Sequence, residues 1–161
     1  MGTKGRVATW AIGLLMLAGY PVLQAGVMPI QGTWILDYKN SKNVPDSVKS
    51  IDLQIVLKGH ELFTQRLFEG APIGEPTVLI LDGVSREREI AKGTMGAISG
   101  SWKANGKLIE QVVKTRAANL LEVVQTTNVT VTDDGELMTR VQTTLQAGER
   151  NERVMIYRRK H

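Results

Sequence analysis

Residues 123–146 read VVQTTNVTVTDDGELMTRVQTTLQ and combine two β-forming runs with a turn between them. The first run is rich in Val and Thr, whose branched side chains pack well on a pleated sheet. Asp133-Asp134-Gly135 follows it, and Gly after Asp supplies the positive φ that a tight hairpin turn needs. The second run alternates strictly and would bury one face, made of Leu137, Thr139, Val141, Thr143 and Leu145. The segment therefore predicts an antiparallel hairpin with one buried and one solvated face.

The same period of two continues over most of the chain after residue 31, and turn residues separate the runs. These turns are Lys58-Gly59-His60, Asp82-Gly83, Asn105-Gly106 and Ala147-Gly148. Counting the runs predicts an all-β domain, an antiparallel meander of about 8–10 strands. The glycine-rich stretches 69–76 and 93–100 are expected as loops or as strands bent by glycine. An up-and-down barrel is favoured because closure protects the sheet edges, and a two-sheet β-sandwich remains the alternative.

Residues 1–25 have the order of a secretory signal peptide. Lys4 and Arg6 precede an uncharged run over residues 7–23, and the small residue Ala25 follows as a cleavage position. We expect residues 26–161 to form one exported domain, periplasmic or secreted. An uncleaved N-terminal anchor is the alternative, although the run is short for a bilayer span of roughly 20 residues. No later segment is long and apolar enough for stable membrane insertion.

Composition excludes several classes of function. The 161 residues contain no cysteine, which excludes disulfides, thiolate metal sites and cysteine nucleophiles. Without Lys4 and Arg6 the chain has 18 basic and 16 acidic residues, a formal charge of +2. These charges are spread along the strands and form no basic stripe, so we expect no nucleic-acid partner.

No group of residues has the spacing of a catalytic or metal site. His60 lies in a turn and His161 ends the chain, and neither has a second ligand at a metal-binding spacing. Glu87 and Glu89 share a strand face, where paired carboxylates could act in glycoside hydrolysis. A charged strand that protects a sheet edge explains them better. We therefore expect no catalytic residues, no metal and no cofactor.

Gly32-Thr33-Trp34 opens the first strand, and this Gly-x-Trp resembles the start of the lipocalins and the wider calycin group. The resemblance implies a barrel whose Trp plugs the closed end while an Arg from the last strand packs across the ring. Trp34 would be the plug, with Arg158 as its partner or, alternatively, Arg153. A closer similarity, over residues 31–161, is to small exported bacterial lipocalin-like proteins, mostly of unknown function. It is carried by Asn40-Ser41-Lys42, Leu81-Asp82-Gly83 and the Trp102 strand before Asn105-Gly106.

This resemblance implies a non-enzymatic barrel that binds a small, largely apolar molecule. The apolar residues expected to face the interior and line a cavity are Leu53, Ile55, Leu62, Leu79, Trp102, Val112 and Val141. A small barrel can instead fill its interior with side chains. The alternative function is therefore a solid-core structural or interaction module of the cell envelope that works through its surface.

Overall fold

The computed structural model describes residues 28–116 and 121–161, and most of these residues lie in ten β-strands. The strands are β1 (Gly32–Leu36), β2 (Ile51–Lys58), β3 (Glu61–Phe68), β4 (Ala71–Ile80), β5 (Arg86–Ala91), β6 (Thr94–Lys103), β7 (Leu108–Arg116), β8 (Glu122–Val131), β9 (Leu137–Gln146) and β10 (Glu149–Arg159). Single-turn 3-10 helices occur at η1 (Tyr38–Asn40), η2 (Asp46–Val48) and η3 (Ala104–Gly106). The leader expected over residues 1–25 lies outside the described residues.

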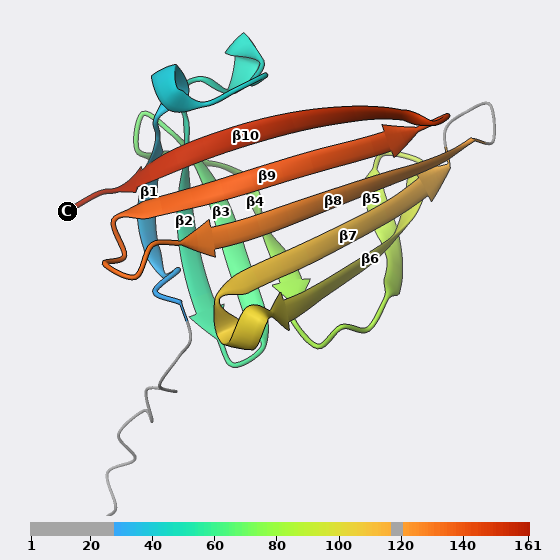
Figure 1. Ribbon diagram of the computed structural model, residues 1–161, viewed down its shortest axis with the longest axis horizontal. Helices are drawn as coiled ribbons and strands as arrows, with labels where there is room; N and C mark the ends of the chain where they lie inside the picture. Colours follow the sequence, from blue (N-terminus) through green and yellow to red (C-terminus); the bar gives the residue numbers. More distant parts are fainter. Residues whose placement is uncertain (1–27, 117–120) are drawn as a thin grey trace, which may run out of the picture.

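All ten strands form one antiparallel sheet in the order β4-β3-β2-β1-β10-β9-β8-β7-β6-β5. Strands adjacent in the chain pair with each other, apart from β4 and β5, which no ladder joins in the described residues. In addition, β1 pairs with β10. The sheet curls on itself, so that the long strands β6–β10 form one wall and β1–β4 cross behind them (Figure 1). The predicted all-β meander and up-and-down barrel are confirmed, with the barrel left unsealed between β4 and β5.

The two glycine-rich stretches belong to strands rather than to loops. Residues 71–80 form β4 and residues 94–103 form β6. At Gly100 of β6 an added Cβ would lie 2.6 Å from Leu79 Cγ and 2.9 Å from the Ile80 carbonyl oxygen. Glycine at this position therefore permits β4 to approach β6 closely, a role that glycine often has within strands.

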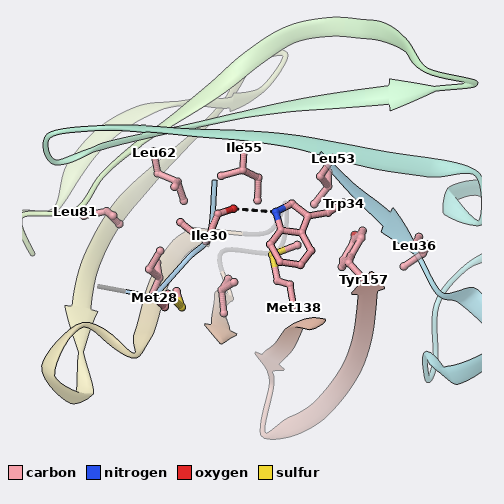
Figure 2. Packing of buried hydrophobic residues seen from close by; sticks show 12 residues of the cluster. Met28, Ile30, Trp34, Leu36, Leu53, Ile55, Leu62, Leu81, Met138 and Tyr157 are labelled. Atoms are coloured by element: carbon pink, nitrogen blue, oxygen red, sulfur yellow. Dashed lines mark hydrogen bonds between the residues drawn. The ribbon is translucent and has the colours of Figure 1, made fainter. Parts of the chain in front are cut away.

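Trp34 is the centre of the core at the closed end of the barrel. It is fully buried, and its Nε1 donates a hydrogen bond to the carbonyl oxygen of Ile30 at 2.8 Å (Figure 2). Apolar residues from both walls pack around it, including Leu53 on β2 and Met138 on β9. Residues 28–31, just before β1, thus fold under the barrel and close its floor.

The cation over the Trp34 ring is Arg159, which corrects the expectation of Arg158 or Arg153. The Arg159 guanidinium lies 4.4 Å from the ring centroid. Side chains alternate along a strand, so Arg158 points to the outer face, where its Nε donates to Asp37 Oδ2 at 2.8 Å. Arg153 lies on the same face as Arg159 but six residues earlier on β10, far from the Trp34 end of the strand.

Arg159 also fastens three segments of backbone. Its Nε donates to the carbonyl oxygen of Gly135 at 2.6 Å, and its Nη1 to that of Gln31 at 2.6 Å. Its Nη2 donates to the carbonyl oxygen of Pro29. Gly32 has a φ of +138°, and a Cβ there would lie 2.5 Å from Arg159 Nη1. The Gly of the Gly-x-Trp motif therefore leaves the space that this guanidinium occupies.

Candidate functional site in the barrel interior

The inner face of β6–β10 changes from apolar to polar along the strands. Side chains of register partners share one face of the sheet, so the ladder defines rows across the wall. One row near the floor consists of Trp102, Ile109, Val129, Arg140 and Met155. The next row toward the open end consists of Gly100, Gln111, Thr127, Gln142 and Arg153. The inner wall is therefore mostly apolar near the floor, and it carries amide, hydroxyl and guanidinium groups toward the open end.

A cavity of about 70 Å³ lies where these two kinds of surface meet. Its apolar lining comes from Ile30, Ile55, Leu62, Val78, Leu79, Ile109, Val129 and Met138. Its polar lining comes from Thr64, Thr77, Arg88, Gln111 and Arg140. The cavity thus offers one apolar side and one side with two cations and three uncharged hydrogen-bonding side chains.

Arg140, on the wall of the cavity, has a buried side-chain donor whose bonding is incomplete. Its Nε is buried and has no hydrogen-bond partner within the described residues. The side chain projects inward from β9, one position beyond the fully buried Met138 on that face. A buried donor without an acceptor costs roughly 1–3 kcal/mol. Arg140 is therefore placed to donate to an oxygen that the cavity receives.

Tyr157 lies on the same inner face, on the neighbouring strand β10. Its side chain is 4% exposed, and burial raises the pKa of its phenol. The nearby Arg140 guanidinium opposes this shift without reversing it. The Tyr157 hydroxyl therefore stays protonated well into the alkaline range, as a neutral group beside the Arg140 cation.

Tyr157 should make the fold sensitive to alkaline pH. Because its pKa is raised in the folded state, its stabilising contribution is complete below the ordinary value of about 10 and is lost as pH rises through the folded-state pKa. Tyr157→Phe removes the titrating group and should flatten this alkaline loss. Urea unfolding of both proteins from about pH 8 to about pH 11 measures the effect. Parallel stability curves for the two proteins would contradict it.

Five of the seven residues expected to line a cavity lie on the inner side of the barrel. Ile55, Leu62 and Leu79 border the cavity itself. Leu53 is buried in the core beneath it, and Trp102 is partly buried against that core. Their contact with a ligand stays a prediction.

Val112 and Val141 lie on the outer face instead, which corrects the expectation for them. Val112 is flanked along β7 by Gln111, which lines the cavity, and Val141 follows Arg140, which also lines it. Successive side chains of a strand point to opposite faces. On β9 the face with Leu145 is the outer one, since Leu145 is 47% exposed and Met138 is fully buried. The rule that the more apolar face of a strand is the inner one therefore fails on β7 and β9, whose inner faces carry Gln111 and Arg140.

The polar residues of the cavity were not identified from the sequence as a site. Arg88 lies between Glu87 and Glu89 in the strand that the sequence predicts as a charged sheet edge, and no motif surrounds Gln111, Thr64 or Thr77. The available signal was the second face of β9, where Met138 and Arg140 stand in one row of alternate positions. A cation at an inward position beside a buried methionine indicates a polar interior.

The described residues show neither a metal cluster nor a membrane helix. Within 28–116 and 121–161, no three or more His, Cys, Asp or Glu side chains gather where they could hold an ion. Glu87 pairs with Ala97 in register and Glu89 with Met95, on the edge strand β5. No helix in these ranges has the length and apolar character to cross a bilayer.

Similar proteins are found by structure and not by sequence. No protein-family model and no curated protein sequence matches the chain. A "REP1-NXSQ fatty acid transporter" superposes with a TM-score of 0.55 and 14% identity, over 81% of this chain and 96% of that one. Zebrafish ileal bile acid-binding protein, complexed with cholic acid, gives 0.50 and 12% identity over 81% and 98%. The fold, a curled antiparallel β-meander, is therefore similar to the folds of these two proteins.

A point mutant of that transporter superposes similarly, with a TM-score of 0.52 and 12% identity over 81% of this chain and 97% of that one. At such identities the similarity describes the fold and not the residues inside it. The interior of this chain must therefore be interpreted from its own side chains, above all Arg140 and Arg88.

Proposed function

We propose that the protein is a non-enzymatic carrier of one small amphipathic acid. The apolar part of the ligand packs on the aliphatic side of the cavity, and its acidic group accepts hydrogen bonds from Arg140. The observation that carries this proposal is the buried Nε of Arg140, which lacks a partner within the described residues at the wall of a cavity. Charge-assisted hydrogen bonds from Arg to a carboxylate are short and strong, and often bidentate.

The fold comparisons support the same class of ligand. The names of the similar structures refer to fatty acids and to cholic acid, molecules that join an apolar body to a carboxylate. Apolar walls with a few placed polar groups are the usual lining of a small-molecule site. Here the walls include Ile55 and Leu62 opposite Arg140 and Gln111.

The size of the cavity limits how the ligand is held. About 70 Å³ accommodates roughly five water molecules, at ~15 Å³ each. Pockets that enclose a drug-sized ligand measure about 300–1,000 Å³. The cavity therefore encloses the acidic group and the adjoining part of the apolar chain, and the rest of the ligand extends toward the open end. The small volume also favours the competing function, a solid-core module of the cell envelope, and binding experiments separate the two.

Arg140→Leu should weaken the binding of decanoate by about 10- to 100-fold, because hydrogen bonds to charged groups contribute about 1.5–3 kcal/mol. Binding of 1-decanol, which has the same chain and no charge, should change little. The folded state should be as stable as before or more so, since the substitution removes a partly buried guanidinium group whose buried Nε has no hydrogen-bond partner among the described residues. Displacement of the fluorophore 1-anilinonaphthalene-8-sulfonate measures both affinities, and urea unfolding measures the stability.

Arg150→Leu is the matched control for this substitution. Arg150 is exposed on the outer face of β10, where its Nη2 lies 3.2 Å from Glu152 Oε2. Removing its charge should leave both affinities unchanged. An equal loss of decanoate and decanol binding in Arg140→Leu would contradict the assignment of Arg140 to the acidic group. Wild-type protein that binds neither compound would favour the solid-core module.

We also propose that the carrier acts outside the cytoplasm, after removal of residues 1–25. The support is the order of charge, apolar run and small residue in the leader. Intact-mass measurement of protein recovered after export tests this. A mass beginning at Gly26 supports cleavage, whereas a full-length species in the membrane fraction would indicate the anchor instead.

A further inference from the structure

The barrel wall is incomplete between β4 and β5, the two ends of the strand order. Within the described residues one side-chain bond spans the gap, from Arg88 Nη1 of β5 to the carbonyl oxygen of Val78 of β4, at 2.8 Å. Beyond the end of β4, Gly83 N donates to the carbonyl oxygen of Gly100 on β6 at 2.8 Å. A backbone hydrogen bond therefore closes the gap at Gly83, and the Arg88 side chain bridges it between β4 and β5.

A hollow of about 110 Å³ opens at this gap. It is lined by Val78, Leu79, Ile80, Arg86, Arg88, Ile98 and Gly100. The inner cavity shares Val78, Leu79 and Arg88 with it. These three residues therefore border both the hollow and the interior.

The two arginines of the hollow are held differently. Arg86 is fixed by Asp82, with its Nη1 donating to Oδ1 at 2.9 Å, and by the carbonyl oxygen of Val84. Arg88 has no carboxylate within ion-pair distance in the described part of the chain, and it is exposed. A single hydrogen bond from an exposed side chain contributes little net stability. The hydrogen bond from Arg88 to Val78 can therefore break more readily than the set of backbone hydrogen bonds that joins two paired strands.

The chemistry of the hollow matches the ligand class proposed above. Val78, Leu79, Ile80 and Ile98 offer aliphatic surface, and Arg86 and Arg88 offer guanidinium groups that bind a carboxylate or sulfonate. Glu87 and Glu89 lie on the opposite face of β5, because side chains alternate along the strand. The hollow thus presents positive charge and apolar surface together.

We propose that the gap between β4 and β5 is a lateral entrance for the amphipathic acid, with the outer hollow as its first binding site and Arg88 as the latch. The ligand's acidic group first meets Arg86 and Arg88, and the swing of Arg88 then joins the hollow to the inner cavity. This inference rests on the proposed function, since it requires a ligand that reaches Arg140.

Arg88→Ala removes the latch, and stopped-flow mixing with 1-anilinonaphthalene-8-sulfonate measures the consequence. Dissociation should accelerate about fivefold, the equivalent of one hydrogen bond worth about 1 kcal/mol. Association should accelerate less, because the variant also lacks one of the two guanidinium groups that first meet the anionic probe. Unchanged rates would overturn the role of Arg88.

Cross-linking tests the route itself, because the chain has no cysteine of its own. A Val78→Cys/Arg88→Cys variant joined by a short bis-maleimide should bind the fluorophore at least tenfold more slowly than the same variant before linking. The control is Thr126→Cys/Thr143→Cys, a register pair on β8 and β9 that is already hydrogen-bonded through its strands. Linking it should leave the rate unchanged.

The outcomes separate the two proposals. Equal rates before and after linking Val78→Cys/Arg88→Cys, with binding intact, would overturn the lateral entrance and leave the carrier function standing. Absence of fluorophore and decanoate binding in the wild-type protein would overturn both. A slower rate in the linked variant with an unchanged control would support the entrance between β4 and β5.

Discussion

Arg159→Ala is expected to lower the free energy of unfolding by about 2–4 kcal/mol, because charged hydrogen bonds and a cation–π contact are lost together. Arg159 donates to the backbone carbonyl oxygens of Gly135, Gln31 and Pro29, and it covers the ring of Trp34. These contacts join the segment before β1, the turn between β8 and β9, and the last strand. Urea unfolding followed by circular dichroism measures the change, at a temperature where the variant remains folded.

Arg158→Ala is the matched control, because it removes the same side chain one residue earlier. Arg158 is 62% exposed and has one ion pair, with Asp37, so its loss should cost less than about 1 kcal/mol. Arg159→Lys should recover little, since an ammonium group cannot donate in the fixed fork of a guanidinium. A loss in Arg158→Ala as large as that in Arg159→Ala would contradict the role given to Arg159.

The strands and turns of this fold were predictable because local rules determine them. The β-branched run that begins at residue 123 lies in β8, which ends at Val131, and Asp133-Asp134-Gly135 forms the turn to β9, with Gly135 at a φ of +78°. The Gly-x-Trp start was informative for a physical reason, because Gly32 leaves room for Arg159 and Trp34 fills the floor. Each of these features depends on a few neighbouring residues.

The direction of each face was not predictable from alternation alone. A period of two shows that a strand has two different faces, and a one-residue error exchanges them. The rule that the apolar face is buried fails on β7 and β9, where Gln111 and Arg140 line a cavity and Val112 and Val141 face outward. The same one-residue error placed Arg158 where Arg159 lies.

The gap and the cavity could not be predicted because they depend on contacts between distant parts of the chain. Arg88 on β5 donates a hydrogen bond to Val78 on β4, although no ladder joins these two strands. Gly100 on β6 packs closely against Leu79 on β4. Their positions follow from how far the sheet curls before its ends meet. That curvature sums the twist of all ten strands, and no short motif encodes it.

Trp34→Ala should cost about 3–5 kcal/mol, the range for removing a buried aromatic side chain. The fully buried ring would leave a cavity, and the Ile30 carbonyl oxygen would lose its 2.8 Å hydrogen bond.

Since the Arg159 guanidinium packs on this ring, the stability lost by the double variant Trp34→Ala/Arg159→Ala should be smaller than the sum of the two single losses, by about 0.5–2 kcal/mol. Trp102→Ala, at a partly buried ring outside the plug, should add to Arg159→Ala without coupling. Urea unfolding of the single and double variants measures this coupling. Additive losses for Trp34→Ala and Arg159→Ala would mean that the ring and the guanidinium stabilise the closed end independently.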